Sequence, residues 1–308
     1  MRWTRNIRAA ALVAVAALSL TACGGGSGGS GQPAAPSKGG APIVVASFNF
    51  TDSQILAEIY AAALEAKGYP VTRKLNLGSR ELIYPSLKSG ELQFLPEYQG
   101  SAITTGFGKD PVKDAAGEHD QLAKLFEPSG ISLLNYAAAE DKNTYIVKAD
   151  LAKSKGLTSI SDLKKLDKVV MAGPPECEKR LPCFQGFKDV YKLTNATFQT
   201  VQEAGPRVQQ LNSGAVTVIP VDSVSPLVGD SQYVALKDDL TIVPTENVVP
   251  AVNKKVLDAR GADFAAVVNA VSAKLTTEGM RELNKRVDSD GEVAADVAKD
   301  WLKQQGLA

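Results

Sequence analysis

The stretch FLPEYQGS, residues 94–101, places a tyrosine and a serine directly after a short apolar run. Open α/β sheets bind ligands beyond the carboxyl ends of their strands, where Tyr98 and Ser101 would lie if the run is a strand. A tyrosine face attracts cations, by roughly 0.5 to 2 kcal/mol per contact. The alternative is a tyrosine packed in the core with its hydroxyl hydrogen-bonded. The residue types therefore predict either a cation contact or ordinary packing.

Cys23 is a second residue whose chemistry depends on its surroundings. It ends the sequence LTAC, after an arginine-containing start and an apolar run from Ala9 to Leu20. This run is too short to cross a bilayer and predicts a secretory signal peptide over residues 1–22. The LTAC ending resembles the lipobox of bacterial lipoproteins, in which the cysteine receives the lipid and becomes the N-terminus. The alternative is a free cysteine at the end of an ordinary signal peptide.

The remaining cysteines, Cys177 and Cys183, lie close together in PPECEKRLPCF. An even pair of cysteines outside the cytoplasm predicts a disulfide. A metal site is the rival interpretation, but two thiols and the single distant His119 do not make a ligand set. We therefore expect a disulfide and no metal.

Few residues suit catalysis. His119 is the only histidine and lies in a charged stretch, and the sequence has no G-x-S-x-G, phosphate loop or nucleotide fingerprint. The chain has 34 basic and 34 acidic side chains, and removal of residues 1–22 takes away three arginines and no acids. Nothing in this balance indicates nucleic acid binding. We expect a protein that is not an enzyme and has no cofactor.

The elements that position these residues follow a Gly, Ser and Pro-rich stretch, residues 23–42, whose composition is typical of a flexible tether. Strand-like and helix-like segments then alternate, which indicates an α/β protein. The first predicted strands are 43–48, 71–77 and 92–95, and the first predicted helices are 52–67, 79–89 and 114–127. The FLPEYQGS strand is expected to stop at Pro96.

A second α/β run extends from Tyr145 to Val243. Its predicted strands are 144–147, 169–173, 197–201 and 216–221. The chain then returns through 247–253 to three helical stretches between Lys254 and Gln305. Two lobes are therefore expected, with lobe 1 formed by residues 43–144 and 246–308 and lobe 2 by residues 145–245.

Several segments together resemble the substrate-binding proteins of ABC importers for glycine betaine, choline and carnitine. The longest is residues 46–103, from ASFNFTDSQIL to FLPEYQGSAI, and the others are KNTYIV (142–147), GLTSISDL (156–163), VNAVSAKLTTEGMRELNKRVD (268–288) and VAKDWLKQQGL (297–307). The resemblance implies a two-lobed type II periplasmic-binding-protein fold with its ligand cleft at the hinge. It also implies a cage of tyrosines around the trimethylammonium group of the ligand.

The resemblance assigns roles residue by residue. Tyr98 and Tyr145 match cage positions, and Ser101 matches a hydroxyl that binds the ligand carboxylate. Arg180 follows Glu176 at the spacing of the family's carboxylate-binding arginine, inside the loop that the two cysteines reshape.

Three positions depart from the family pattern. Phe48, before Asn49 in SFNFT, stands where the family often has a basic residue. Asp222 and Glu246 stand where aromatic residues of the cage are common. We expect these three residues and Asn49 to line the site, and the two acids to contact the cation. The alternative is that both acids face water or that the matching has slipped by a residue, since acids are usually exposed.

The sequence thus predicts an extracytoplasmic, lipid-anchored receptor for a small cationic or zwitterionic solute. It would deliver this solute to an ABC permease and its ATPase complex. A receptor for a different betaine or amine is the first alternative, and an extracytoplasmic enzyme is the second.

Overall fold

The structure is a computed structural model that describes residues 38–308. The predicted signal peptide, Cys23 and most of the predicted tether lie outside these residues. Within residues 38–308, no helix has both the length and the apolar character needed to cross a membrane.

A five-stranded sheet organises lobe 1, in the order β2-β1-β3-β10-β4. Its strands are β1 (Ile43–Ala46), β2 (Val71–Lys74), β3 (Phe94–Tyr98), β4 (Ile131–Leu133) and β10 (Val248–Asn253). β1 pairs in parallel with β2 and β3, whereas β10 is antiparallel to β3 and to β4. β4 was not predicted.

The prediction that the third strand stops at Pro96 is wrong, because β3 continues to Tyr98. Pro96 lies opposite Pro250 in the antiparallel pairing with β10. Neither proline has an N–H group. In an antiparallel pairing every second pair of opposite residues exchanges no hydrogen bond, and such a pair accommodates both prolines. As a result Tyr98 is the last residue of a fully buried strand.

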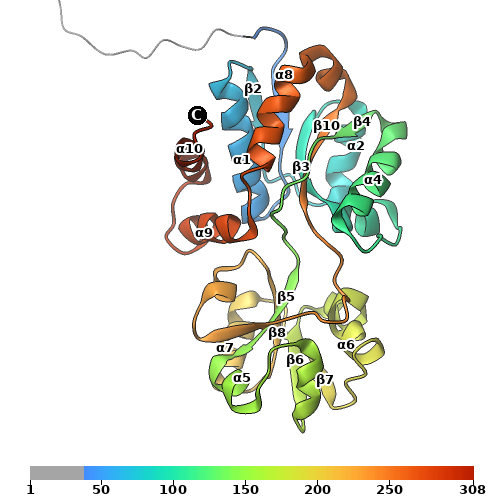
Figure 1. Cartoon of the computed structure of the whole chain (residues 1–308), viewed down its shortest axis with the longest axis vertical. Helices are drawn as coiled ribbons and strands as arrows, with labels where there is room; N and C mark the ends of the chain where they lie inside the picture. The colour runs from blue at the N-terminus through green and yellow to red at the C-terminus, as the bar shows by residue number, and fades with distance from the viewer. Residues whose placement is uncertain (1–37) are drawn as a thin grey trace, which may run out of the picture. The chain divides into compact units, whose positions relative to one another are not determined.

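Helices cover both sides of this sheet. Figure 1 shows α1 and α10 on one side and α2 and α4 on the other. The bounds are α1 (Thr51–Ala66), α2 (Arg80–Ser89), α3 (Gln99–Ser101), α4 (Ala115–Phe126), α8 (Lys254–Ser272), α9 (Thr277–Asp288) and α10 (Ala294–Gln304). A π-helical turn, Ala102–Gly106, follows α3, and a 3₁₀ turn, Glu127–Ser129, follows α4. α1 carries alanine and large aliphatic residues on nearly every face, and it is buried almost throughout.

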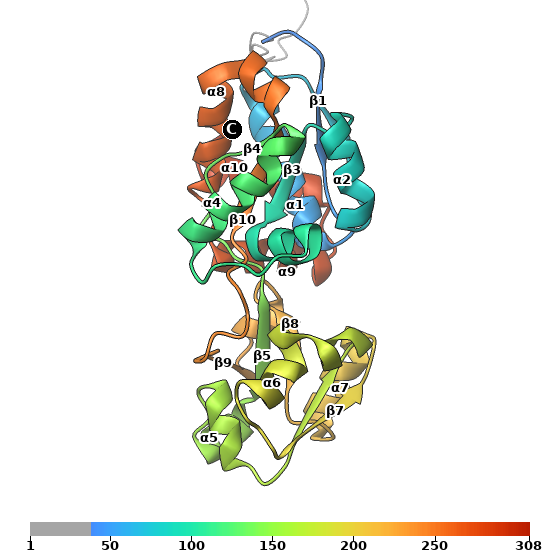
Figure 2. The ribbon, with the colours of Figure 1, turned by 90° about the vertical axis from the view of Figure 1, so that its right-hand side faces the viewer.

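Lobe 2 has two small sheets. β5 (Asn143–Lys148) lies between β8 (Ile219–Asp222) and β9 (Tyr233–Leu236), and β6 (Val169–Gly173) pairs in parallel with β7 (Ala196–Thr200). Figure 2 shows β5 between β8 and β9. The helices are α5 (Ala149–Lys155), α6 (Gly186–Asp189) and α7 (Ala204–Ser213), with 3₁₀ or π turns at Ile160–Lys165, Pro175–Lys179, Leu181–Gln185 and Pro226–Gly229. β9 was not predicted.

Two chain segments cross between these sheets side by side. Glu140 and Asn247 form an isolated antiparallel bridge, and the Asp141 amide donates to the Glu246 carbonyl at 3.1 Å. A third connection comes from the segment after β8, because the Arg281 guanidinium of α9 donates to the Ser223 carbonyl at 3.0 Å. Residues of both crossing segments are therefore held next to the ends of β1 and β3.

Candidate ligand-binding site

The parallel strands β1 and β3 end at the same edge of the sheet, and aromatic side chains gather there. The rings of Phe48 and Phe50 are stacked, with centroids 5.6 Å apart and an interplanar angle of 10°. The Phe50 ring lies 5.9 Å from that of Tyr98. Phe48 and Tyr98 are buried, whereas Phe50 is 38% exposed. Phe50, which was not predicted as a site residue, thus presents the accessible aromatic face.

A basic group does lie beside Phe48, although the sequence suggested that one had been lost. The Arg80 guanidinium lies 4.8 Å from the centroid of the Phe48 ring. It also pairs with Glu97 at 2.6 Å, and the Tyr84 hydroxyl donates to the same carboxylate at 2.7 Å. Glu97 is fully buried. The network therefore fixes Arg80 against Phe48 and compensates the buried carboxylate.

The hydroxyl of Tyr98 is bound to an acid. It donates to a carboxylate oxygen of Asp52, in the first turn of α1. Burial raises the pKa of Asp52 to about 7, and the charge of Asp222 adds to this effect while the Tyr98 hydrogen bond opposes it. Asp52 is therefore a carboxyl group that changes its charge near neutral pH.

Ser101 and Glu246, both predicted as site residues, bind each other. The Ser101 amide and hydroxyl donate to the Glu246 carboxylate at 2.9 and 2.8 Å. Burial raises the pKa of Glu246 to about 8, although both bonds from Ser101 lower it. Gly100 permits this approach, because a Cβ there would lie 2.5 Å from the Thr245 carbonyl oxygen.

Asp222 and Asp141 add two more carboxyl groups. Burial raises the pKa of Asp141, and the charges of Asp52, Asp222 and Glu246 add to this effect. One Asp141 oxygen is buried without a hydrogen-bond partner among the described residues. Asp141 was missed because it lies in a crossing segment with no motif of its own.

Asp222 combines an exposed side chain with a raised pKa. Water reaches the carboxylate, yet the surrounding protein weakens its hydration, and the charge of Arg207 only partly offsets this effect. The Nε of Arg207 is buried without a partner inside residues 38–308.

Two predicted residues, Tyr145 and Arg180, are not brought to this cluster. The Tyr145 ring packs in the core of lobe 2 against Phe187, with centroids 4.8 Å apart, and its hydroxyl donates to the Pro182 carbonyl at 2.7 Å. Arg180 is exposed on its loop. Asn49 is exposed as well, but it lies in the chain between Phe48 and Phe50.

The loop that carries Arg180 is closed by a disulfide. It joins Cys177 and Cys183, whose Cα atoms are 5.3 Å apart. Both cysteines are buried while Arg180 between them is exposed. The bridge therefore holds the two ends of the loop in the core of lobe 2.

The chemistry of the cluster favours a cation. Four carboxyl groups with raised pKa values, Asp52, Asp141, Asp222 and Glu246, repel one another when ionised, and a positive ligand relieves that repulsion. No group of acids, histidines or cysteines suited to holding a metal ion occurs among residues 38–308. The arrangement therefore fits an organic cation next to an aromatic face.

Comparisons with known proteins show which family this chain resembles along most of its length. A family model described as the substrate-binding domain of ABC-type glycine betaine transport systems matches residues 41–304. The glycine-betaine-binding protein of Pseudomonas aeruginosa is 27% identical over 269 residues, covering 84% of this chain and 86% of that protein. The glycine betaine-binding protein YehZ of Escherichia coli is also 27% identical, covering 88% of this chain and 93% of its own.

A solved structure described as a glycine betaine/carnitine/choline ABC transporter has the same fold. It superposes with a TM-score of 0.78 at 21% identity, over 86% of this chain and 99% of that chain. The predicted type II periplasmic-binding-protein fold is confirmed.

Proposed function

We propose a specific task for this chain, which belongs to the family of substrate-binding domains of ABC-type glycine betaine transport systems. The family consists of transport proteins and not of enzymes. The proposed task is capture of a small quaternary-ammonium solute outside the cytoplasm and its delivery to an ABC permease with its ATPase. The protein would be held at the membrane by a lipid on Cys23.

One observation carries the choice of solute, namely a set of four carboxyl groups whose charges act on one another, of which Asp52 accepts a hydrogen bond from Tyr98 beside the Phe50 ring. Each aromatic contact supplies roughly 0.5 to 2 kcal/mol to a bound cation. One carboxylate about 4 Å from the cation supplies a gross attraction of about 4 kcal/mol at an effective dielectric near 20. Desolvation of the acid offsets part of this attraction. Carboxylates thus supply the attraction for the cation that aromatic residues at positions 222 and 246 would otherwise supply.

The same carboxylates disfavour a carboxylate on the ligand. Ser101, the predicted partner of that group, is occupied by Glu246. Arg180, the other predicted partner, is exposed on the disulfide loop. We therefore propose that the site prefers choline, which has no carboxylate, to glycine betaine. Tyr145 and Arg180 stay predictions, because binding would have to bring them to the solute, and Asn49 stays a prediction because its side chain has no described contact with the cluster.

Calorimetric titration of the chain from residue 23 onward tests the proposal with choline, glycine betaine and carnitine. Choline is expected to bind most tightly and to bind more weakly as salt increases. Tyr98→Ala and Asp222→Asn are each expected to weaken choline binding. Glu178→Gln, on the exposed part of the disulfide loop, is the control for loss of one acid.

Two results would count against the proposal. Unchanged choline affinity in Tyr98→Ala would show that the Tyr98 ring does not contact the solute. Unchanged affinity in Asp222→Asn would place that carboxylate outside the site. Absence of binding by all three solutes would leave the family assignment intact but would reject this class of solute.

A further inference from the structure

A second feature lies at the other end of the lobe 1 sheet from the aromatic rings. A cavity of about 910 Å³ is lined by residues before β1, before β3 and after β10. Its walls carry five basic side chains and one acidic side chain: Lys38, Lys88, Lys254, Lys255, Arg260 and Asp258. The chain after residue 22 has more acidic than basic residues, because only 31 of the 34 basic residues remain beside 34 acidic ones. The cavity is therefore basic, although the chain after residue 22 is acidic overall.

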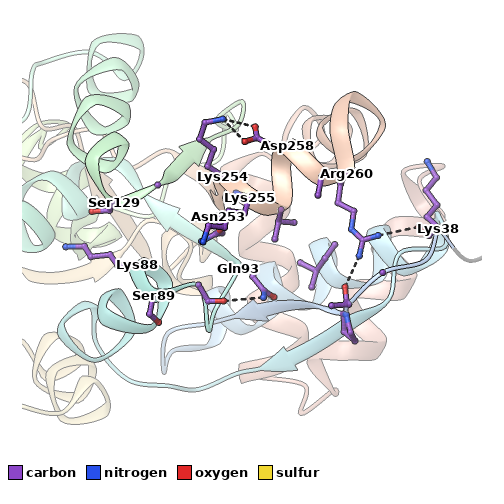
Figure 3. A pocket seen from close by; sticks show the side chains of 18 of the residues that line it. Lys38, Lys88, Ser89, Gln93, Ser129, Asn253, Lys254, Lys255, Asp258 and Arg260 are labelled. Atoms are coloured by element: carbon purple, nitrogen blue, oxygen red, sulfur yellow. Dashed lines mark hydrogen bonds and ion pairs between the residues drawn. The ribbon is translucent and has the colours of Figure 1, made fainter.

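Much of this positive charge is not neutralised. Figure 3 shows Lys254 turned toward Asp258, and the two are 2.7 Å apart. Arg260 donates to carbonyl oxygens of the segment 38–41, so its charge meets backbone and not a carboxylate. Lys88 and Lys255 are exposed and form no ion pair with any residue that the structure describes. Lys38 pairs with Asp263 at 3.0 Å, so Lys88 and Lys255 are the two cations at this cavity that remain available to an external anion.

The position of the cavity indicates which anion it meets. The segment 38–42 forms one of its walls, and Arg260 fixes that wall. Fifteen positions separate Lys38 from Cys23, so the chain between them can reach at most about 50 Å. With a lipid on Cys23, the cavity would therefore remain within reach of the membrane surface. Attraction between lysines and anionic headgroups acts only within about a Debye length, so access to the surface is required.

We propose that this basic cavity is a contact surface for anionic phospholipid headgroups. The contact holds lobe 1 with its tether end against the bilayer. The proposal rests on the lipid anchor of the proposed function, and it is independent of the solute that the protein captures. Each cation near an anionic surface raises membrane partition about fivefold.

Vesicle sedimentation tests the surface without the anchor. The probe is the chain from residue 23 onward with Cys23→Ala, which retains every described residue but carries no lipid. We expect it to sediment with vesicles of three parts phosphatidylcholine to one part phosphatidylglycerol at low salt. We expect no sedimentation with phosphatidylcholine alone, and loss of binding as salt increases.

The paired variant Lys88→Gln and Lys255→Gln is expected to reduce partition about 25-fold. The matched control, Lys153→Gln and Lys179→Gln, changes two exposed lysines of lobe 2 and the net charge by the same amount. An equal loss in both pairs would show adsorption by net charge and would overturn the proposal. Absence of sedimentation of the parent with anionic vesicles would overturn it as well.

Free glycerol 3-phosphate separates a headgroup surface from a pocket for a small soluble anion. Millimolar concentrations at constant ionic strength are expected to leave sedimentation unchanged. Complete displacement would assign the cavity to a small anion and refute the membrane contact. Choline affinity of the Lys88→Gln, Lys255→Gln variant is expected to equal that of the parent, so failure of this proposal and failure of the proposed function give different results.

Discussion

Replacement of Glu246 by glutamine provides the sharpest test of the proposed site. Burial raises the pKa of Glu246 to about 8, so the group is about one tenth ionised at pH 7 and about nine tenths ionised at pH 9. A cation that binds beside the ionised form gains affinity as that form becomes populated. Choline affinity is therefore expected to rise about tenfold from pH 7 to pH 9. Glu246→Gln keeps an oxygen for the Ser101 amide but cannot ionise, so the rise should disappear.

The assay is calorimetric titration with choline at pH 7, 8 and 9 and constant ionic strength. Choline keeps its charge over this range, so the dependence reports the protein. Two buffers with different ionisation enthalpies measure the protons released on binding, and Glu246→Gln should release fewer. Asp52, whose pKa is raised to about 7, titrates mostly at the lower end of the range. Glu282→Gln, on the exposed side of α9, is the control.

Stability provides a second measurement of the same group. The pKa of Glu246 is raised from 4.5 to about 8, so the folded state retains a proton that the unfolded state releases between these values. The free energy of unfolding therefore falls as pH rises through this window, by on the order of 5 kcal/mol. Below pH 4.5 this loss is absent. The buried ionisable role of Glu246 would be refuted if the choline affinity and the stability of the parent protein did not change with pH. It would also be refuted if Glu246→Gln showed the same pH dependence of both quantities as the parent.

Three other changes test separate parts of the structure. Gly100→Ala would place a Cβ 2.5 Å from the Thr245 carbonyl oxygen, so we expect the free energy of unfolding to fall by about 1 to 3 kcal/mol and the melting temperature to fall with it. Gly205→Ala is the control, because a Cβ there has nothing within 4 Å and should not destabilise the protein. The loop disulfide should block both thiols from alkylation until reduction, and two freely alkylated thiols in exported protein would contradict it. Cys23→Ala should release the protein from membranes or leave its signal peptide uncleaved, and membrane-bound mature variant would exclude lipidation.

The order of elements was predictable because apolar periodicity and glycine punctuation are local signals. The predicted helix 52–67 corresponds to α1, Thr51–Ala66, and the predicted strand 169–173 corresponds to β6. Pro96 misled the prediction because its effect depends on the opposite strand. A proline normally ends a ladder, but here its partner is another proline, 154 positions later in the chain.

The site was less predictable because its contacts join distant residues. Ser101 and Glu246 are 145 positions apart, and neither residue type reveals that the two bind each other. The direction of the Tyr145 side chain depends on strand register, since a shift of one residue turns it to the opposite face. The pKa values of Asp52 and Asp141 are raised first by burial and then by the charges of other acids, and both causes arise only in the folded chain. Sequence patterns identify which types of residue a site contains, but the pKa values of those residues depend on the neighbours that folding brings to them.

The place of β10 has a consequence for how the chain folds. This strand lies between β3 and β4, yet it is made after all of lobe 2. Until residues 248–253 are available, β3 is an edge strand with unpaired backbone groups, and β4 has no neighbour in the sheet. Long-range pairings of this kind slow folding and leave edges that aggregate. Lobe 2, by contrast, draws its strands from one continuous segment. We therefore expect lobe 2 to fold first during refolding from denaturant, and chains truncated before residue 248 to aggregate through lobe 1.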